Sequence, residues 1–212
     1  MNNSSEKTNI IAWLSKFRIN NYNLVFDEIN QEYVINVDGN VPLHAYKLDI
    51  LPFKFGKVTG DFDVAINCLD CLNNCPDYVG GSFSATDNNL TDLKYLPKFI
   101  GKHIYLYNNN ISNLEGLPTK VNGDLYLQNN KLTSFEHISR EILGKLIIHS
   151  NNIQNFDFFP EYVANKINLN YNIKLKPLSC IENFSQLQKE LNYIDLTNNL
   201  PTNHYQTKKR KI

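Results

Sequence analysis

The stretch Ile104-Tyr105-Leu106-Tyr107-Asn108-Asn109-Asn110-Ile111-Ser112-Asn113-Leu114 decides the fold, because the chain repeats its pattern on both sides. The next copy is Leu125-Tyr126-Leu127-Gln128-Asn129-Asn130-Lys131-Leu132-Thr133-Ser134-Phe135, with apolar side chains and a central Asn at the same places. The step between the two copies is 21 residues. A fixed period of roughly 20–50 residues indicates stacked supersecondary units, since one such unit cannot bury its own apolar face.

Outward from this stretch, the same step holds in both directions along the chain. One apolar column comprises Val41, Phe62, Phe83, Ile104, Leu125, Leu146 and Ile167, and a second comprises Leu43, Val64, Ala85, Leu106, Leu127, Ile148 and Leu169. A third column is asparagine, at Asn67, Asn88, Asn109, Asn130, Asn151 and Asn172. These columns predict a solenoid in which each unit begins with a short parallel strand of alternating side chains.

The asparagine column is expected to be structural. An Asn side chain has both a donor and an acceptor for backbone groups left open where the chain leaves a strand, so stacked copies would form a ladder. The return path of each unit keeps a β-branched column, Val58, Val79, Ile100, Val121, Ile142 and Val163, beside several prolines and glycines. We predict an extended or polyproline-like return, with Gly80 and Gly81 permitting a tight turn into the next strand.

A solenoid exposes its core at both ends and therefore needs caps. We predict an N-terminal cap over residues 1–39, repeats over 40–175, a C-terminal cap over 176–203 and a basic disordered tail over 204–212. In the first cap, Thr8 or Asn9 is suited to begin a helix. The expected apolar face of that helix comprises Ile10, Ile11, Leu14 and Phe17, and strands are expected near 23–27 and 33–37. The C-terminal cap is expected to contain a helix over 181–191 and a last strand near 193–200.

The composition limits the classes of function. Lys plus Arg and Asp plus Glu each number 21, so no net charge draws the whole molecule to nucleic acid or to an anionic membrane. The N-terminus has no charged-then-apolar leader and no apolar run is long enough to span a bilayer, so we predict a cytoplasmic protein without a membrane partner. The five histidines show no triad or zinc-protease spacing and no phosphate-binding loop is present, so we expect neither an enzyme nor a cofactor.

The spacing Cys68-x-x-Cys71-x-x-x-Cys75 suits ligation of zinc or an iron–sulfur cluster. The repeat register favours another interpretation, because Cys75 falls in the core column while Cys68 and Cys71 fall in exposed columns. We therefore predict one packed cysteine, two loop thiols and no metal, with a metal site as the alternative.

The run from Ile104 to Leu114 resembles the leucine-rich-repeat family, and Leu117-Pro118 is similar to its short bacterial subclass, which includes Yersinia outer protein M. The spacing from Pro76 to Gly81 also resembles repeat proteins encoded by tailed phages. The resemblance implies a curved array with a parallel sheet on its concave face that binds proteins. For a phage protein it implies a host protein as the partner, in the host cytoplasm. Ser139 departs from the pattern, since proline stands at this place in neighbouring units.

Side chains that point outward from the strands are the candidate binding residues, because the core needs none of them. The predicted partner site comprises Tyr105, Tyr107, Tyr126, Gln128, Ile147, His149 and His103. Aromatic residues also favour exposed strand positions through cross-strand packing alone, which is the competing interpretation. We expect a non-catalytic protein-binding module. The alternatives are a nucleic-acid binder that uses Tyr, Lys145, Lys166 and the basic tail, or a structural virion component.

Overall fold

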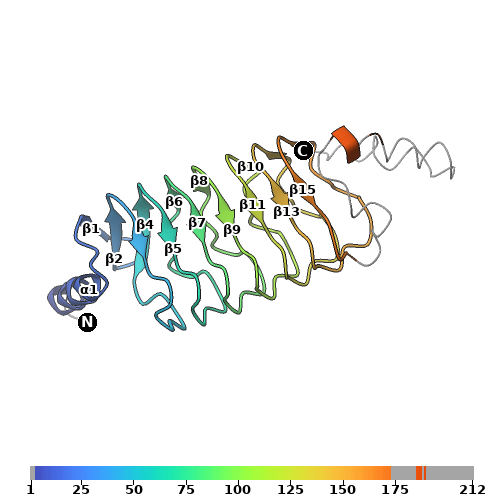
Figure 1. Ribbon diagram of the computed structural model, residues 1–212. Helices are drawn as coiled ribbons and strands as arrows, with labels where there is room; N and C mark the ends of the chain where they lie inside the picture. The colour runs from blue at the N-terminus through green and yellow to red at the C-terminus, as the bar shows by residue number, and fades with distance from the viewer. Residues whose placement is uncertain (1–2, 173–184, 188, 190–212) are drawn as a thin grey trace.

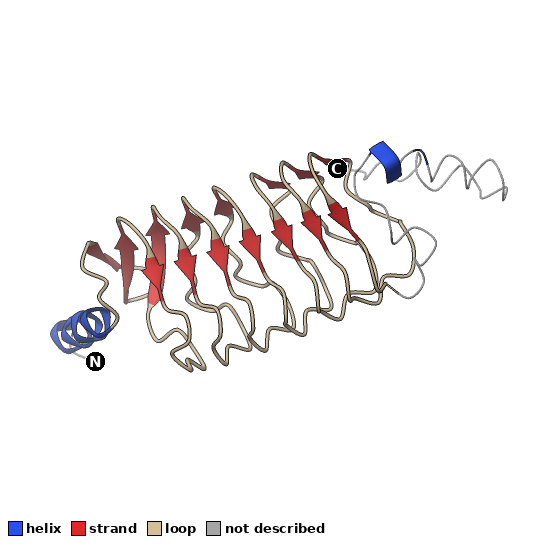
Figure 2. Cartoon of the chain, viewed as in Figure 1, coloured by secondary structure: helices blue, strands red, loops and turns tan. Residues whose placement is uncertain are grey.

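The computed structural model describes residues 3–172, 185–187 and 189. It is a solenoid in which successive turns of the chain stack side by side, with a helix at the N-terminal end (Figure 1). We number these 21-residue turns as coils, and coils 1 to 7 begin at Asn40, Asp61, Ser82, His103, Asp124, Lys145 and Lys166. Short strands lie on two sides of coils 1 to 6 and loops join them (Figure 2). The predicted repeat solenoid with a parallel sheet is confirmed.

One strand from each coil contributes to a parallel sheet of seven strands. In spatial order these are β15 (Ile167–Asn168), β13 (Leu146–Ile147), β11 (Leu125–Tyr126), β9 (Ile104–Tyr105), β7 (Phe83–Ser84), β5 (Phe62–Asp63) and β3 (Val41–Pro42). The register advances by one period at every step, so that Leu125 lies between Ile104 and Leu146. The first residue of every strand is fully buried, and the second side chain therefore faces outward.

The return side of the coils also carries strands, which the sequence analysis did not predict. A five-stranded sheet has the order β1 (Tyr22–Asp27), β2 (Glu32–Val37), β4 (Lys54–Val58), β6 (Tyr78–Val79) and β8 (Phe99–Ile100). A separate sheet comprises β10 (Lys120–Val121), β12 (Glu141–Ile142) and β14 (Tyr162–Val163). The extended return was predicted correctly, but its backbone is paired. The Gly80 N–H, for example, donates to the Val58 carbonyl at 2.9 Å.

The two return sheets are separated between coils 3 and 4, where β8 and β10 do not pair. At this step the side-chain Nδ2 of Asn122 donates to the Ile100 carbonyl oxygen at 3.0 Å. At the equivalent position one coil earlier, a backbone N–H, that of Gly101, donates to the Val79 carbonyl at 2.9 Å. The seven-stranded sheet continues through the same step, so the interruption affects one side of the solenoid only.

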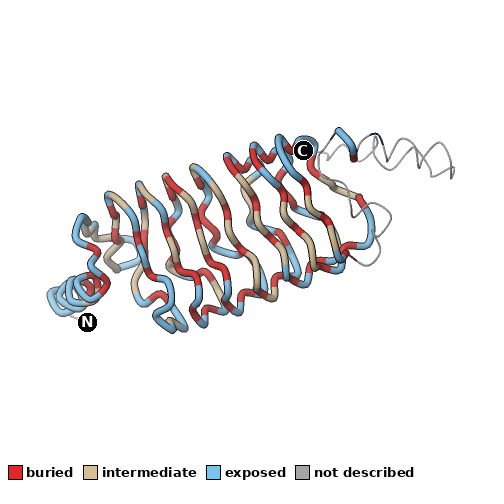
Figure 3. Tube along the Cα trace, in the orientation of Figure 1, coloured by how far each residue is buried: buried red, intermediate tan, exposed pale blue. Residues whose placement is uncertain are grey.

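The core runs between the two sides, and buried and exposed residues alternate along each coil (Figure 3). Two glycines, Gly80 and Gly101, show how closely the coils stack. A Cβ atom on Gly80 would collide with the Thr59 carbonyl oxygen, and one on Gly101 would collide with the Gly80 carbonyl oxygen. Gly80 and Gly81 lie in the bend between β6 and β7, where the turn was predicted, and neither has a positive φ angle. Close approach of neighbouring backbones is what requires glycine at these positions.

The chain leaves each strand of the seven-stranded sheet through a residue in the left-handed region. This residue directly precedes each ladder asparagine, and φ lies between 53° and 59° at Ile66, Asp87, Asn108, Asn129, Ser150 and Tyr171. Such angles are uncommon outside glycine, although Asn and Asp tolerate them best. The side chain of the next residue, the ladder asparagine, bonds the backbone of the turn.

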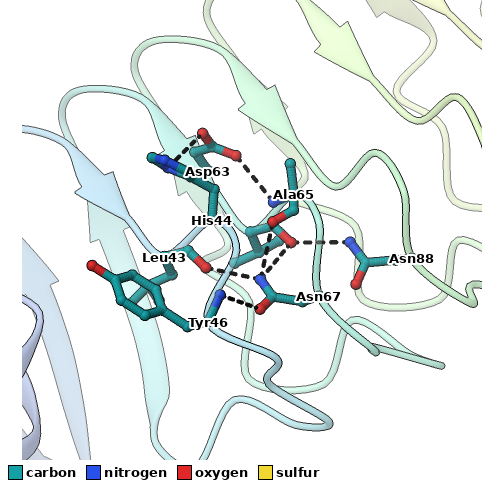
Figure 4. Close-up of polar contacts among 8 residues, drawn as sticks. Leu43, His44, Tyr46, Asp63, Ala65, Asn67 and Asn88 are labelled. Atoms are coloured by element: carbon teal, nitrogen blue, oxygen red, sulfur yellow. Dashed lines mark hydrogen bonds and ion pairs between the residues drawn. The ribbon is translucent and has the colours of Figure 1, made fainter.

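Each asparagine of the column joins two coils (Figure 4). Asn67 Nδ2 donates to the Leu43 carbonyl at 2.8 Å in coil 1 and to the Val64 carbonyl at 2.9 Å in its own coil. Its Oδ1 accepts the backbone N–H groups of Tyr46 and Leu48 at 3.1 and 3.0 Å. The same pattern recurs at Asn88, Asn109, Asn130, Asn151 and Asn172, all of them buried. The backbone left open by the turn is thereby satisfied in every coil.

The N-terminal segment packs against coil 1. Helix α1 spans Asn3–Lys16, so the predicted start at Thr8 or Asn9 is wrong, and the Thr8 hydroxyl instead donates to the Ser4 carbonyl within the helix. Ile10, Leu14 and Phe17 are buried, as expected for the apolar face, whereas Ile11 is 40% exposed. Trp13 contacts Phe17, Phe53 and Phe55. The strands predicted near 23–27 and 33–37 are present as β1 and β2, and the structure pairs them antiparallel.

The predictions for the C-terminal cap and the basic tail lie outside the described residues, apart from helical residues at 185–187 and 189. No helix within the described part of the chain is long and apolar enough to cross a membrane.

Candidate functional site

Each coil presents three outward side chains along the seven-stranded sheet, and we call this array the sheet face. The coil-start column is Asn40, Asp61, Ser82, His103, Asp124, Lys145 and Lys166. The strand column is Pro42, Asp63, Ser84, Tyr105, Tyr126, Ile147 and Asn168. The post-strand column is His44, Ala65, Thr86, Tyr107, Gln128, His149 and Asn170. The largest side chains of the sheet face lie together on coils 4 to 6, where the predicted partner residues are found.

Tyr105 and Tyr126 are stacked at the centre of the sheet face. Parallel pairing places Tyr126 between Tyr105 and Ile147, and the two tyrosine ring centroids are 5.0 Å apart with an interplanar angle of 22°. The His103 ring lies 5.9 Å from that of Tyr105. All four side chains are half-buried. The packing holds each ring in one orientation, so less side-chain entropy is lost when a partner binds.

Asp124 connects His103 and Tyr126. The Tyr126 hydroxyl donates to Asp124 Oδ2 at 3.2 Å, and the Lys145 backbone N–H donates to Asp124 Oδ1 at 2.7 Å. The Asp124 backbone N–H donates to His103 Nδ1 at 2.9 Å, so in the neutral ring the proton is on Nε2. Only 15% of the Asp124 side chain is exposed. The carboxylate therefore acts as a fixed support under the aromatic pair.

The environment shifts the titration of both tyrosines. Burial, followed by the charge of Asp124 and its hydrogen bond, raises the pKa of Tyr126 to about 12. Burial also raises the pKa of Tyr105, with smaller contributions from the charges of Asp124 and Asp61. Both hydroxyls are protonated at neutral pH. The proton of Tyr126 is directed at Asp124, so this hydroxyl offers a partner its oxygen as an acceptor, whereas the Tyr105 hydroxyl can also donate.

The post-strand column places Tyr107, Gln128 and His149 on consecutive coils, all half-buried. Gln128 Oε1 is buried and, within the described part of the chain, accepts no hydrogen bond. His149 Nδ1 lies 3.0 Å from the Ser150 hydroxyl, and burial lowers the pKa of the imidazole, which favours the neutral ring. An unsatisfied buried acceptor costs about 1–3 kcal/mol of stability.

The predicted site residues are thus adjacent in space, and three of them, His103, Tyr105 and Tyr126, make ring contacts or share the contacts of Asp124. Tyr107, Gln128, Ile147 and His149 extend the same surface along two columns. The Cys motif lies apart from the sheet face. Cys75 is buried and burial raises the pKa of its thiol, Cys71 is half-buried and Cys68 is exposed. Among the described residues, no group of three His, Cys, Asp or Glu side chains is arranged to hold a metal ion.

Comparison with protein-family models, with curated proteins and with solved structures finds no match. The functional interpretation therefore depends on the geometry of the sheet face.

The sequence analysis did not include Asp124 in the predicted partner site and missed the pattern to which it belongs. In the coil-start column, Asn40, Asp61, His103 and Asp124 each accept the backbone N–H of the residue that begins the next coil. In each case the residue twenty positions later is glycine, and a Cβ atom there would meet the acceptor. The four glycines are Gly60, Gly81, Gly123 and Gly144. After Ser82 and Lys145 the same position holds Lys102 and Asn165. A glycine twenty residues after a short acceptor is the signal that could have found this second ladder.

Proposed function

We propose that the protein is a non-catalytic protein-binding module of the leucine-rich-repeat type, and that the sheet face of coils 4 to 6 binds a segment of another protein. The observation that carries this proposal is the stacked pair of Tyr105 and Tyr126, which is supported from below by Asp124. Protein interfaces are enriched in Tyr, and clustered aromatic anchors contribute most of the binding free energy in many of them.

The fold supports this assignment because it needs none of these side chains for its core. Leu106 and Leu127, the buried neighbours of the site, are fully inaccessible to solvent and contribute the packing. The tyrosines contribute apolar rings and polar hydroxyl groups on the outside. A surface of this kind, apolar in its centre and polar at its tips, suits a protein segment that has both backbone amides and apolar side chains.

The leucine-rich-repeat assignment is supported by the unit itself. Coils 2 to 6 each have a short strand, a left-handed residue, a buried asparagine that bonds two coils and an extended return. These features agree with the resemblance of residues 104–114 to that family.

Nucleic acid is the weaker candidate partner. Lys145 and Lys166 lie on the sheet face with the tyrosines, but so do Asp61, Asp63 and Asp124. A phosphate backbone that crosses the coils would pass these carboxylates, and like charges repel it. A fluorescent oligothymidine is therefore expected to show no saturable binding to the full chain, and binding that weakens steeply with added salt would favour the alternative.

The test uses a partner recovered on the immobilised full chain from the cells in which the protein occurs. Tyr105→Ala combined with Tyr126→Ala is expected to weaken binding of that partner by at least about 2 kcal/mol, or roughly 30-fold, which is a hot-spot magnitude. Thermal unfolding should change far less than in Leu106→Ala, where a fully buried side chain is truncated.

The return side offers a matched control. Tyr78 and Phe99 form an aromatic stack of the same kind, with ring centroids 4.7 Å apart and an interplanar angle of 10°. Tyr78→Ala with Phe99→Ala should leave the affinity unchanged. Normal binding by the Tyr105/Tyr126 variant, together with loss of binding by the Tyr78/Phe99 variant, would place the site on the other side of the solenoid.

A further inference from the structure

The charges of the sheet face are sorted along the solenoid. Coil 2 presents two carboxylates, Asp61 and Asp63, whereas coils 6 and 7 present two amines, Lys145 and Lys166. The tyrosines of coils 4 and 5 lie between these ends. A surface that is acidic at one end, aromatic in the middle and basic at the other end has a direction, and electrostatic complementarity with a partner selects an orientation.

The acidic end is held in place by the backbone. Asp61 Oδ1 accepts the Ser82 N–H at 2.7 Å, and Asp63 Oδ1 accepts the Ala65 N–H at 3.0 Å. Asp63 Oδ2 also lies 3.4 Å from His44 Nδ1. Asp61 is exposed. Its charge is one of those that raise the pKa of Tyr105 after burial, so the field of the acidic end reaches the aromatic pair.

Between the acidic end and the tyrosines, coil 3 presents only small side chains. These are Ser82, Ser84 and Thr86, and Thr86 is almost completely buried. The neighbouring Ala65 on coil 2 is also buried. No large side chain therefore projects from the sheet face on the coil 3 side of Tyr105. A long side chain of a partner has room to lie against the tyrosine ring there, with its charged end at coil 2.

The basic end is free to meet an anion. Lys145 and Lys166 are both exposed, and within residues 3–172 neither forms an ion pair. Asp124, the nearest acidic residue of the coil-start column, does not neutralise them. Its carboxylate is mostly buried and is occupied by the Tyr126 hydroxyl and the Lys145 backbone N–H.

We propose that the sheet face binds an extended segment of a partner protein that carries a Lys or Arg over coils 2 and 3, an apolar or aromatic residue over Tyr105 and Tyr126, and an Asp or Glu over coils 6 and 7. This inference rests on the proposed function. Four to five strand spacings of about 4.8 Å separate the two ends, or roughly 19–24 Å. An extended chain rises about 3.3 Å per residue, so about six or seven residues separate the basic and the acidic side chains of the partner.

The test is a selection of displayed random decapeptides on the full-length protein. Enriched peptides are expected to carry a basic and an acidic residue about six or seven positions apart, with an apolar or aromatic residue between them. Selection on Asp61→Asn with Asp63→Asn should lose the basic preference and keep the acidic one. Selection on Lys145→Gln with Lys166→Gln should do the reverse. Synthetic copies of the enriched peptides should bind each charge variant about tenfold more weakly.

The matched control is Asp77→Asn with Lys98→Gln, which removes an exposed ion pair of 3.4 Å from the return side and should keep both preferences. Peptides that need Tyr105 and Tyr126 but carry no sorted charges would overturn this inference and leave the proposed function intact. Charge preferences that persist in both charge variants would also overturn it. If no enriched peptide depends on Tyr105 and Tyr126, the inference and the proposed function both fail.

Discussion

The two sides of the coils differ in continuity. On one side, seven strands pair without interruption from β3 to β15, while on the return side the strands form two sheets that end at β8 and begin again at β10. The continuous side has two side-chain ladders in addition to its backbone pairing, namely the buried asparagines and the coil-start acceptors. At the step between coils 3 and 4 the coil-start column holds Ser82, which is not one of the four acceptors, whereas the asparagine ladder continues through Asn109, which donates to the Ala85 carbonyl at 2.9 Å. The buried asparagines therefore bond neighbouring coils at the step where the return strands do not pair.

The break on the return side coincides with a change in local conformation. Asn74, Tyr95, His137 and Phe158 occupy the same corner of their coils with φ between 64° and 67°, whereas Gly116 has φ of 107°. The two residues that follow Gly116, Leu117 and Pro118, are half-buried, although their counterparts Leu96 and Pro97 one coil earlier are buried. Only glycine adopts such a φ without strain, and a Cβ atom on Gly116 would collide with the Leu93 carbonyl oxygen of coil 3, so this corner of coil 4 requires glycine.

The largest expected effect is the loss of stability when a core side chain is truncated, which should differ between the two sides of the coils. Leu106→Ala should destabilise the protein by about 2–5 kcal/mol, because it creates a cavity at a fully buried position beside the continuous sheet. Leu117→Ala should cost clearly less, because Leu117 is already half-exposed next to the break. Urea unfolding of both variants measures the difference. Equal losses would show that coil 4 is packed as tightly on its return side as on the other.

The side-chain ladders are the next point of comparison. Asn130 donates to the Leu106 and Leu127 carbonyls and accepts the Ile111 N–H, all at 3.0 Å, so Asn130→Ala should cost about 1–3 kcal/mol by leaving buried backbone groups unpaired. Asn122→Ala removes the single side-chain bond across the break and should cost about 0.5–1.5 kcal/mol. Chemical denaturation ranks the two. A larger loss from Asn122→Ala would mean that the break is held by its one hydrogen bond.

A stabilising change tests the return side of coil 5. Ser139 is 1% exposed and, within the described residues, its hydroxyl makes no hydrogen bond, while Pro97, Pro118 and Pro160 stand at the same place in other coils. Ser139→Pro should raise stability by about 1 kcal/mol, because it removes a buried unpaired hydroxyl and restricts the unfolded chain. Ser139→Ala should give only the gain in stability that comes from removing the unpaired hydroxyl. A lower melting temperature for Ser139→Pro would show that the backbone of coil 5 does not follow its neighbours.

The smallest expected effect concerns the ionisation of tyrosine, for which the two aromatic stacks have different surroundings. Tyr126 is bonded to Asp124, whereas Tyr78 lies under the Lys57 amine at 5.1 Å. The raised pKa of Tyr126, about 12, means that the folded state keeps the proton when an unfolded chain, near 10, has lost it. Its contribution to stability is therefore full below about pH 10 and is lost as the pH rises towards 12.

The absorbance of tyrosinate measures this titration directly. Tyr126→Phe should remove a late-titrating tyrosine from the full chain. Asp124→Asn should move that titration towards lower pH only in part, since burial is the larger cause of the shift. A titration that does not change in Tyr126→Phe would assign the late group to another residue.

Much of the fold could be predicted from the sequence because each position of the repeat unit occurs several times, and the residue types found there show whether the position is buried. A single Leu106 is ambiguous, but seven apolar residues at one step of 21 define an inward column, and the two residues beside each define outward columns. The candidate site followed from that register alone. The start of helix α1 could not be predicted in the same way, because Asn3–Lys16 occurs once and its local capping signals at Thr8 and Asn9 lie inside the helix.

By itself, the sequence determined the period, the buried columns, the asparagine ladder and the adjacency of Tyr105 with Tyr126, since all of these depend only on which position of the unit a residue occupies. The tertiary structure alone decided the pairing of the return strands, its interruption between β8 and β10 and the support of Tyr126 by Asp124. These features depend on the distance between neighbouring coils. Backbone approach at glycines such as Gly80 and Gly101 sets that distance, and the residue type in a column does not specify it.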